Sequence, residues 1–222
     1  MRDLSHTQSL LIAAQQQIGR LGALAIAGYV AAATAIYSVA DSYYYNEDSL
    51  YWLTAIFVWG LGYLLLVHLM RVNGPAGEQH FGGVGGYFAL GLFAGIAIVV
   101  GVILFIIPGL YLMMRWLPAY ARYQHAGTDV VGAMRWSWEH TEDIQLALFL
   151  ALIGPVLMLA AALTFSIANA FYLHDIIDPT SIWPFWVINL LSSLSVAWTQ
   201  LLGVAAYRVI QRHHSVPVET FE

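Results

Sequence analysis

YFALGLFAGIAIVVGVILFIIPGLYLMMRWLPAYARY, residues 87–123, is the stretch that decides the fold. Residues 87–107 are almost entirely apolar and have the length of about 20 residues that a helix needs to cross a bilayer. Pro108-Gly109 then interrupts the run, because proline removes a backbone donor and glycine allows a sharp turn. The apolar character returns in residues 110–123. The chain therefore either turns back at Pro108-Gly109 and crosses again, or continues without another crossing.

The rest of the chain has the same apolar character. Of its 222 residues, 60% are hydrophobic and 9% are charged, whereas soluble domains carry about 25% charged residues. Long apolar segments recur along the chain, separated by short polar stretches. These features predict an all-α, polytopic membrane protein with a single transmembrane domain over residues 1–222. The predicted crossings are residues 18–39, 50–70, 87–107, 109–123, 145–167 and 183–209.

The distribution of arginine bears on the number of crossings, since arginine supplies all eight basic residues. With five crossings, three arginines lie on one side and five on the other. With six crossings, all eight lie on one side or in the returning helix near it, and the loops 40–49 and 168–182 carry acids and no arginine. The positive-inside rule favours the second arrangement. We therefore expect six transmembrane helices, a Pro-Gly hairpin between the third and fourth, and both termini in the cytoplasm.

Several function classes are excluded by what the sequence lacks. The absence of cysteine excludes disulfides and thiol chemistry. No acidic residue or lysine lies in the middle of a predicted crossing, although proton- and sodium-coupled carriers usually need such groups. Scattered arginines and a pI of about 5.8 do not suit a nucleic-acid partner. We predict no catalytic residue, no metal site and no cofactor, and therefore a protein that is not an enzyme.

Small residues mark where helices could approach one another closely. Membrane helices associate through such faces, because lipid tails are as apolar as leucine. Gly91 and Gly95 are four residues apart on the third predicted helix, and Gly101 follows, which makes this helix the expected centre of the bundle. The face could serve packing within the chain or a homodimer seam. Gly154-Pro155 should kink the fifth helix, either as a static bend or as a hinge.

Arg115 is the charged residue with the most informative position. A turn at Pro108-Gly109 places it inside the returning helix, where a centrally placed arginine costs about 2.5–3.5 kcal/mol. Its guanidinium could bind a small anion or a lipid phosphate, which it can contact in bidentate fashion. Alternatively it is structural, and reaches the interface or hydrogen-bonds to Asn189, Gln200 or a carbonyl near Pro155.

Residues 128–140 are predicted to form an amphipathic helix, capped by Thr128 or Asp129. Arginine and tryptophan suit the headgroup layer, so we expect the helix to lie on the cytoplasmic face of the membrane. A docking surface for a partner is the alternative. The residues that define this interfacial helix are Val130, Met134, Arg135, Trp136 and Trp138.

The region from the third to the fifth predicted helix resembles a known family. Ile107-Pro-Gly-Leu-Tyr-Leu-Met-Met-Arg-Trp116 and Gly132-Ala-Met-Arg-Trp-Ser-Trp-Glu-His-Thr141 are similar to motifs of the YciC-like bacterial inner-membrane proteins. That family looks related to the membrane domain attached to some glycerophosphodiester phosphodiesterases. The resemblance implies six helices, a location in the bacterial inner membrane and a role connected with lipids or the envelope. It implies no catalytic residues.

Two functional hypotheses follow. The first is a non-enzymatic structural or accessory subunit of a membrane complex or of the envelope, with a protein partner or a second copy of itself beside it and membrane lipids around it. The second is a carrier or binder of a lipid or small anion that uses Arg115.

Overall fold

The computed structural model describes residues 2–43, 48–73, 82–173 and 182–215, and in these parts of the chain the regular structure is entirely helical. The elements are α1 (Arg2–Gln17), α2 (Arg20–Tyr43), α3 (Asp48–Asn73), α4 (Val84–Leu104), α5 (Ile106–Trp116), α6 (Ala119–Ala126), α7 (Val130–His140), the 3₁₀ turn η1 (Glu142–Ile144), α8 (Gln145–Ala168), the π-helical turn η2 (Asn169–Leu173) and α9 (Trp183–Ser215).

Five helical stretches among the described residues are long and apolar enough to cross a membrane. They are Leu21–Ser42, Trp52–Val72, Val84–Leu104, Glu142–Phe171 and Trp183–Arg212. Each overlaps one of the predicted crossings, with ends shifted by a few residues. The fold is therefore helical, as predicted, and compatible with a multi-pass membrane protein.

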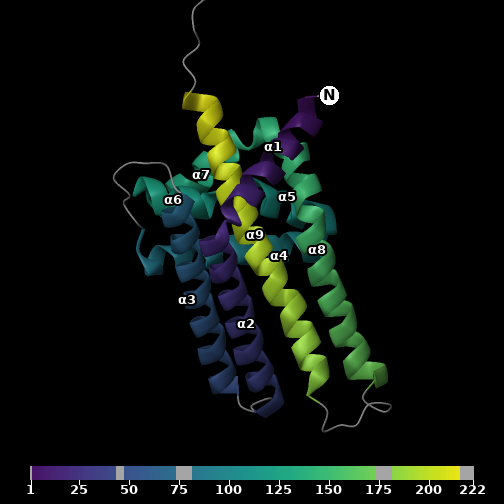
Figure 1. The fold of residues 1–222 in the computed structure, drawn as a ribbon. Helices are drawn as coiled ribbons and strands as arrows, with labels where there is room; N and C mark the ends of the chain where they lie inside the picture. The colour runs from purple at the N-terminus through teal and green to yellow at the C-terminus, as the bar shows by residue number, and fades with distance from the viewer. Residues whose placement is uncertain (1, 44–47, 74–81, 174–181, 216–222) are drawn as a thin grey trace, which may run out of the picture.

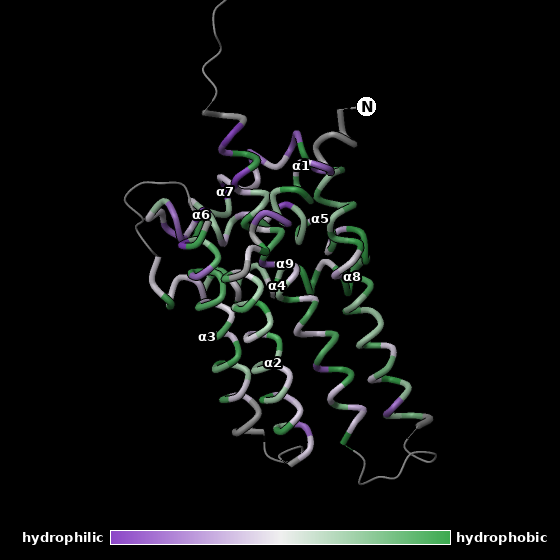
Figure 2. Tube along the Cα trace, viewed as in Figure 1, coloured by the Kyte–Doolittle hydropathy of each residue, from purple (hydrophilic) through white to green (hydrophobic). Residues whose placement is uncertain are grey.

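The long helices are not all parallel. In Figure 1, α2, α3, α8 and α9 run side by side toward the lower end, whereas α4 and α5 lie across them in the upper half. The first helix, α1, and the C-terminal end of α9 lie at the same, upper end, together with α6 and α7. Figure 2 shows that most hydrophilic residues gather at this end and that the lower half is largely hydrophobic.

The centre of the bundle is α9 and not α4, so that sequence-based prediction is wrong. α9 packs against α1, α2, α3, α6 and α8. In the most apolar part of α9, 44% of the residues are buried, whereas in that of α4 the share is 28%. Within α9, small side chains such as Ala197, Ala205 and Ala206 are almost fully buried, which lets the surrounding backbones approach.

The predicted glycines of α4 differ in their surroundings. A Cβ on Gly91 would overlap the Trp59 ring of α3, and a Cβ on Gly101 would lie 2.9 Å from the Gly109 Cα of α5. Gly95 has no other group within 4 Å of the position of a Cβ. Gly91 and Gly101 thus serve packing within the chain, and Gly95 faces open space.

The chain reverses at Phe105, which is extended (φ −159°, ψ 132°) and separates α4 from α5. Pro108-Gly109 is not the break; it lies in the first turn of α5, where proline costs no helical hydrogen bond. Side chains around the reversal are highly exposed, with Ile103 at 77%, Phe105 at 73% and Ile107 at 79%. Exposed apolar groups of this kind suit contact with lipid tails.

The sixth predicted crossing, residues 109–123, is not confirmed. The stretch is divided between α5 and α6, which are separated at Leu117 and Pro118. With 11 residues, α5 extends about 16 Å, or about half of the hydrocarbon core. In contrast, Pro155 does not interrupt α8, which is helical from Gln145 to Ala168.

Candidate functional site: an uncharged cavity between the helices

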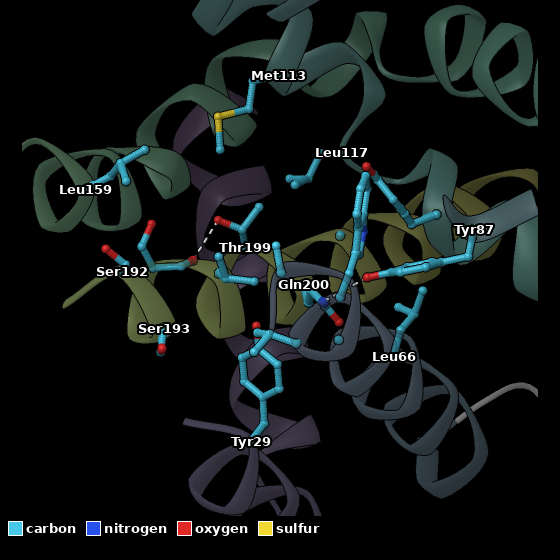
Figure 3. Close-up of a pocket in the computed structure, with 18 of the residues that line it drawn as sticks. Tyr29, Leu66, Tyr87, Met113, Leu117, Leu159, Ser192, Ser193, Thr199 and Gln200 are labelled. Carbon is cyan, nitrogen blue, oxygen red and sulfur yellow. Dashed lines mark hydrogen bonds between the residues drawn. The ribbon is translucent and has the colours of Figure 1, made fainter. Parts of the chain in front are cut away.

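A cavity of about 620 Å³ lies between the helices, with walls from α2, α3, α4, α5, α6, α8 and α9 (Figure 3). Apolar side chains such as Val58, Leu66, Met113 and Leu159 form much of its surface. Its polar lining consists of Tyr29, Tyr37, Tyr87, Tyr120, Asn189, Ser192, Ser193, Ser195, Thr199 and Gln200. None of the described residues that line it is charged.

One face of α9 provides most of the polar groups. Asn189, Ser192, Val196, Thr199 and Gly203 recur at steps of three or four residues, which places them on one side of a helix. Sequence reasoning missed this polar stripe, because the stripe carries no charge and lies within an otherwise apolar helix. The spacing of its serine, threonine and amide residues was the signal that could have revealed the cavity.

The hydroxyl groups of this face are largely engaged. The Thr199 hydroxyl donates to the Ser195 carbonyl over 2.8 Å, and the Ser192 hydroxyl donates to the Ile188 carbonyl over 2.9 Å. The Ser195 hydroxyl donates to the Pro155 carbonyl of α8 over 2.8 Å and so joins two walls of the cavity. These hydroxyls therefore have internal partners without any ligand.

Gln200 and Tyr87 form the polar contact in the middle of the cavity wall. The Gln200 amide Nε2 donates to the Tyr87 hydroxyl over 3.1 Å (Figure 3). Tyr87 is 4% exposed, and its ring lies between those of Tyr63 and Tyr120, with centroids 5.5 Å and 5.4 Å away. The Gln200 Oε1 is buried and has no hydrogen-bond partner among the described residues.

Asn189 marks the opposite end of the polar stripe. Its amide Nδ2 donates to the Asp41 carboxylate over 2.7 Å and to the Ser38 hydroxyl over 3.3 Å. Both partners belong to α2, so this contact joins α2 to α9. The carboxylate itself is not among the residues that line the cavity.

Arg115 is buried, at 4% exposure, but it does not line the cavity. Its Cζ lies 4.6 Å from the centroid of the Trp138 ring and 5.8 Å from that of Tyr111. Its backbone carbonyl accepts a hydrogen bond of 2.6 Å from the Ser137 hydroxyl. The side-chain Nε and Nη1 are buried and have no hydrogen-bond partner among the described residues.

The hydrogen bonds considered for a structural Arg115 are not formed. Asn189 pairs with residues of α2, and Gln200 pairs with Tyr87. The Pro155 carbonyl accepts from Ser195 instead. The prediction that Arg115 contacts an anion or a lipid phosphate stays a prediction.

The predicted interfacial helix corresponds to α7, and its N-cap is Asp129, whose Oδ1 accepts from the Gly132 amide over 3.1 Å. Ala133 and Ser137 are fully buried, and Val130 and Met134 pack against the core. This face is therefore docked on the protein itself.

The other predicted residues of α7 lie at its edges. Arg135 is exposed, and Trp138 is 38% exposed. Trp136 is partly buried; its ring packs against Tyr207 with centroids 5.3 Å apart, and the Arg122 Cζ lies 5.0 Å from its centroid. Only the outer edge of α7 remains available to lipid headgroups or to a partner.

Tyr207 joins α6 to α9 near the hydrophilic end. Its hydroxyl lies 2.9 Å from the His125 Nδ1 and accepts from the Gln211 Nε2 over 2.6 Å. Burial, and secondly the positive charge of Arg122, lowers the pKa of His125. A neutral His125 can accept a hydrogen bond from the Tyr207 hydroxyl at Nδ1. No group of three metal-ligating side chains occurs in the described part of the chain.

The described part of the chain is helical, and five of its helical stretches are long and apolar enough to cross a membrane. The chain matches no family model, no curated protein and no solved structure. The resemblance to the YciC-like proteins therefore stays a prediction from the two motifs.

Proposed function

We propose that this chain is a multi-pass membrane protein that binds an uncharged, lipid-like small molecule within the bilayer. The cavity is the observation that carries the proposal. Its volume of about 620 Å³ falls within the range of about 300–1,000 Å³ that small-molecule sites occupy. A mostly apolar wall with a few oriented polar groups is typical of such sites.

The chemistry of the wall supports an uncharged ligand. A buried charge is costly unless it is paired, and the described lining residues offer no opposite charge. Tyrosine, serine, threonine and amide side chains can instead hydrogen-bond to hydroxyl or carbonyl groups. This version of the binding hypothesis does not use Arg115, which lies outside the lining.

We propose further that four helices cross the membrane and that the pair α4 and α5 enters and leaves from one side. The crossing helices are α2, α3, α8 and α9, whose axes lie roughly parallel to one another in Figure 1. The exposed reversal around Phe105 would then lie among lipid tails. Both termini would face the cytoplasm, the side that the positive-inside rule assigns to the arginine-rich end, in the inner membrane of a bacterium.

The topology can be tested directly, because the chain contains no cysteine. Single cysteines at Phe105 and at Asp143 should both resist a membrane-impermeant thiol reagent added to intact spheroplasts. After lysis the cysteine at 143 should react. Reaction at 105 in intact spheroplasts would show that α4 crosses completely and would contradict the proposal.

Ligand binding can be tested with two glycines of α3. A Cβ on Gly62 would lie 3.0 Å from the Gln200 Nε2 and 3.1 Å from the Tyr87 hydroxyl, whereas Gly60 has nothing within 4 Å. Gly62→Leu should fill part of the cavity, and Gly60→Leu is the matched control. We expect mass spectrometry of the protein purified in mild detergent to detect a neutral lipid with wild type and Gly60→Leu, and much less with Gly62→Leu. Equal amounts in all three proteins, or none in any, would contradict the proposal.

The accessory-subunit hypothesis and the expectation that the chain is not an enzyme stay predictions. The same purification tests the first of them, because a stoichiometric partner protein or a homo-oligomer should be recovered with the chain. A monomer without companions would count against it and would leave the ligand proposal intact.

A further inference from the structure

Among the residues that line the cavity, Gln200 presents a polar atom that no described group satisfies. Its Oε1 is buried and without a hydrogen-bond partner, although buried polar atoms are usually paired. The atom is a carbonyl oxygen and can only accept. A group that donates a hydrogen bond is therefore missing from this part of the cavity.

The Gln200 amide is oriented with its Nε2 toward Tyr87. Its Nε2 donates to the Tyr87 hydroxyl, and Tyr87 is itself held between two aromatic rings. Gly62 leaves room for this contact, since a side chain there would meet both partners. With Nε2 engaged, the Oε1 is the amide atom left for a ligand.

Three neighbouring hydroxyls of α9 already have acceptors for their protons. Those of Ser192 and Thr199 donate to carbonyls of their own helix, and that of Ser195 donates to α8. Among the described lining residues, the Gln200 Oε1 is the buried side-chain atom that lacks a hydrogen-bond partner. A ligand that places a donor here satisfies the buried oxygen, whereas a ligand without a donor leaves it unpaired.

We propose that the cavity selects a lipid alcohol of the diacylglycerol type, whose free hydroxyl donates a hydrogen bond to the Gln200 Oε1. This inference rests on the proposed function and specifies the ligand class. The acyl chains occupy the apolar part of the cavity, among Val58, Met113 and Leu159. The absence of charge among the described lining residues disfavours an ammonium donor and favours an uncharged donor such as a hydroxyl.

The test compares two ligands that differ only at the donor. Binding of 1,2-dioctanoylglycerol and of its 3-acetyl ester is measured on the purified full-length protein in detergent by thermal stabilisation over a concentration series. Wild type should bind the alcohol about tenfold more tightly than the ester, the factor that corresponds to about 1.4 kcal/mol. Gln200→Met, which keeps the length of the side chain, should bind both ligands equally.

Two further variants make the result specific. Thr199→Val removes a polar group of the same wall whose hydroxyl already has a partner, and it should keep the tenfold preference. Tyr87→Phe frees the Gln200 Nε2 to donate, so the ester should gain affinity and the preference should shrink. Because Tyr87→Phe retains the ring packing, it tests the idea even if Gln200→Met does not fold.

The outcomes separate the inference from the proposed function. Equal binding of alcohol and ester by wild type, or an unchanged preference in Tyr87→Phe or Gln200→Met, would overturn the role of Gln200 while the cavity still binds lipid. A preference lost equally in Thr199→Val would also overturn it. Binding of neither ligand by wild type would overturn this ligand class, and detection of no neutral lipid at all in the purified protein would remove the proposed function with it.

Discussion

Gly101→Ala should weaken the contact between α4 and α5, and Gly95→Ala is its matched control on the same helix. A Cβ on Gly101 would lie 2.9 Å from both the Gly109 Cα and the Gly109 nitrogen, and 3.3 Å from the Pro108 carbonyl carbon. Favourable carbon–carbon contacts lie at about 3.5–4.0 Å, so the two backbones must separate by about 0.6 Å or more. The neighbouring atoms belong to the backbone and cannot rotate away.

The size of the effect follows from two opposing contributions. Overpacking of this kind costs about 1–3 kcal/mol, whereas alanine in place of glycine inside a helix gains up to about 1 kcal/mol. Gly95→Ala should receive the gain without the cost, because no other group lies within 4 Å of its Cβ. The two variants should therefore differ in their free energy of unfolding by about 1–3 kcal/mol.

Thermal unfolding of the purified protein in detergent measures this difference. For a chain of this size, 1 kcal/mol corresponds to about 2–4 °C, so the Tm of Gly101→Ala should lie about 2–12 °C below that of Gly95→Ala. Equal Tm values would refute the close approach at Gly101. A Tm for Gly95→Ala below that of wild type would show that Gly95 has a neighbour, such as a second copy of the chain. That result would support a homodimer contact at this face of α4.

Three further predictions test single contacts. Arg115→Met should raise the Tm in neutral detergent, because removing two unpartnered buried donors, worth about 1–3 kcal/mol each, outweighs the loss of a cation–π contact of about 0.5–2 kcal/mol. If anionic lipid then raises the Tm of wild type above that of the variant, an anion contact at Arg115 is supported. If no lipid produces such a difference in Tm, the anion contact is contradicted. Ser195→Ala should lower stability by about 0.6–1.7 kcal/mol in equilibrium unfolding, since it removes the bond to Pro155, and Ser192→Ala should cost less. The folded structure lowers the pKa of His125, so as the pH falls the unfolded chain binds a proton at this histidine before the folded chain does. The free energy of unfolding should therefore be unaffected by His125 above about pH 6.5 and should decline below it. The decline should be smaller in His125→Gln, and parallel pH profiles of the two proteins would contradict the assignment.

The long crossings could be predicted from the sequence because a bilayer imposes a length and an apolar composition on every helix that spans it. The predicted crossing 50–70 corresponds to Trp52–Val72, and 183–209 corresponds to Trp183–Arg212. The N-cap of α7 was predicted as Thr128 or Asp129, and it is Asp129; capping can be narrowed this far because it depends on a few neighbouring residues. The crossings and the N-cap both depend on constraints that act within a short segment, and such constraints can be recognised in one sequence.

The centre of the bundle and the cavity could not be predicted in the same way. Glycine spacing shows that a helix can pack closely, but not which helix is the neighbour; Gly91 meets α3 and Gly95 meets nothing. The cavity depends on seven helices meeting around one polar stripe of α9, and mean hydropathy averages that stripe with its apolar opposite face. Helix-by-helix spacing of serine, threonine and amide residues would have been the better measure.

The division of residues 109–123 shows why charge counting alone could not decide the number of crossings. A helix pair that crosses completely and returns places its flanking arginines on the same side as a pair that enters only part of the bilayer and returns. The positive-inside rule distinguishes these two arrangements from a single crossing, but it cannot distinguish a complete crossing and return from a partial entry and return. Length can, because α5 has 11 residues and ends before Pro118. In the proposed topology α4 and α5 add no crossing, and Met113 of α5 and Leu117, which follows α5, line the cavity, so this short helix contributes a wall to the site.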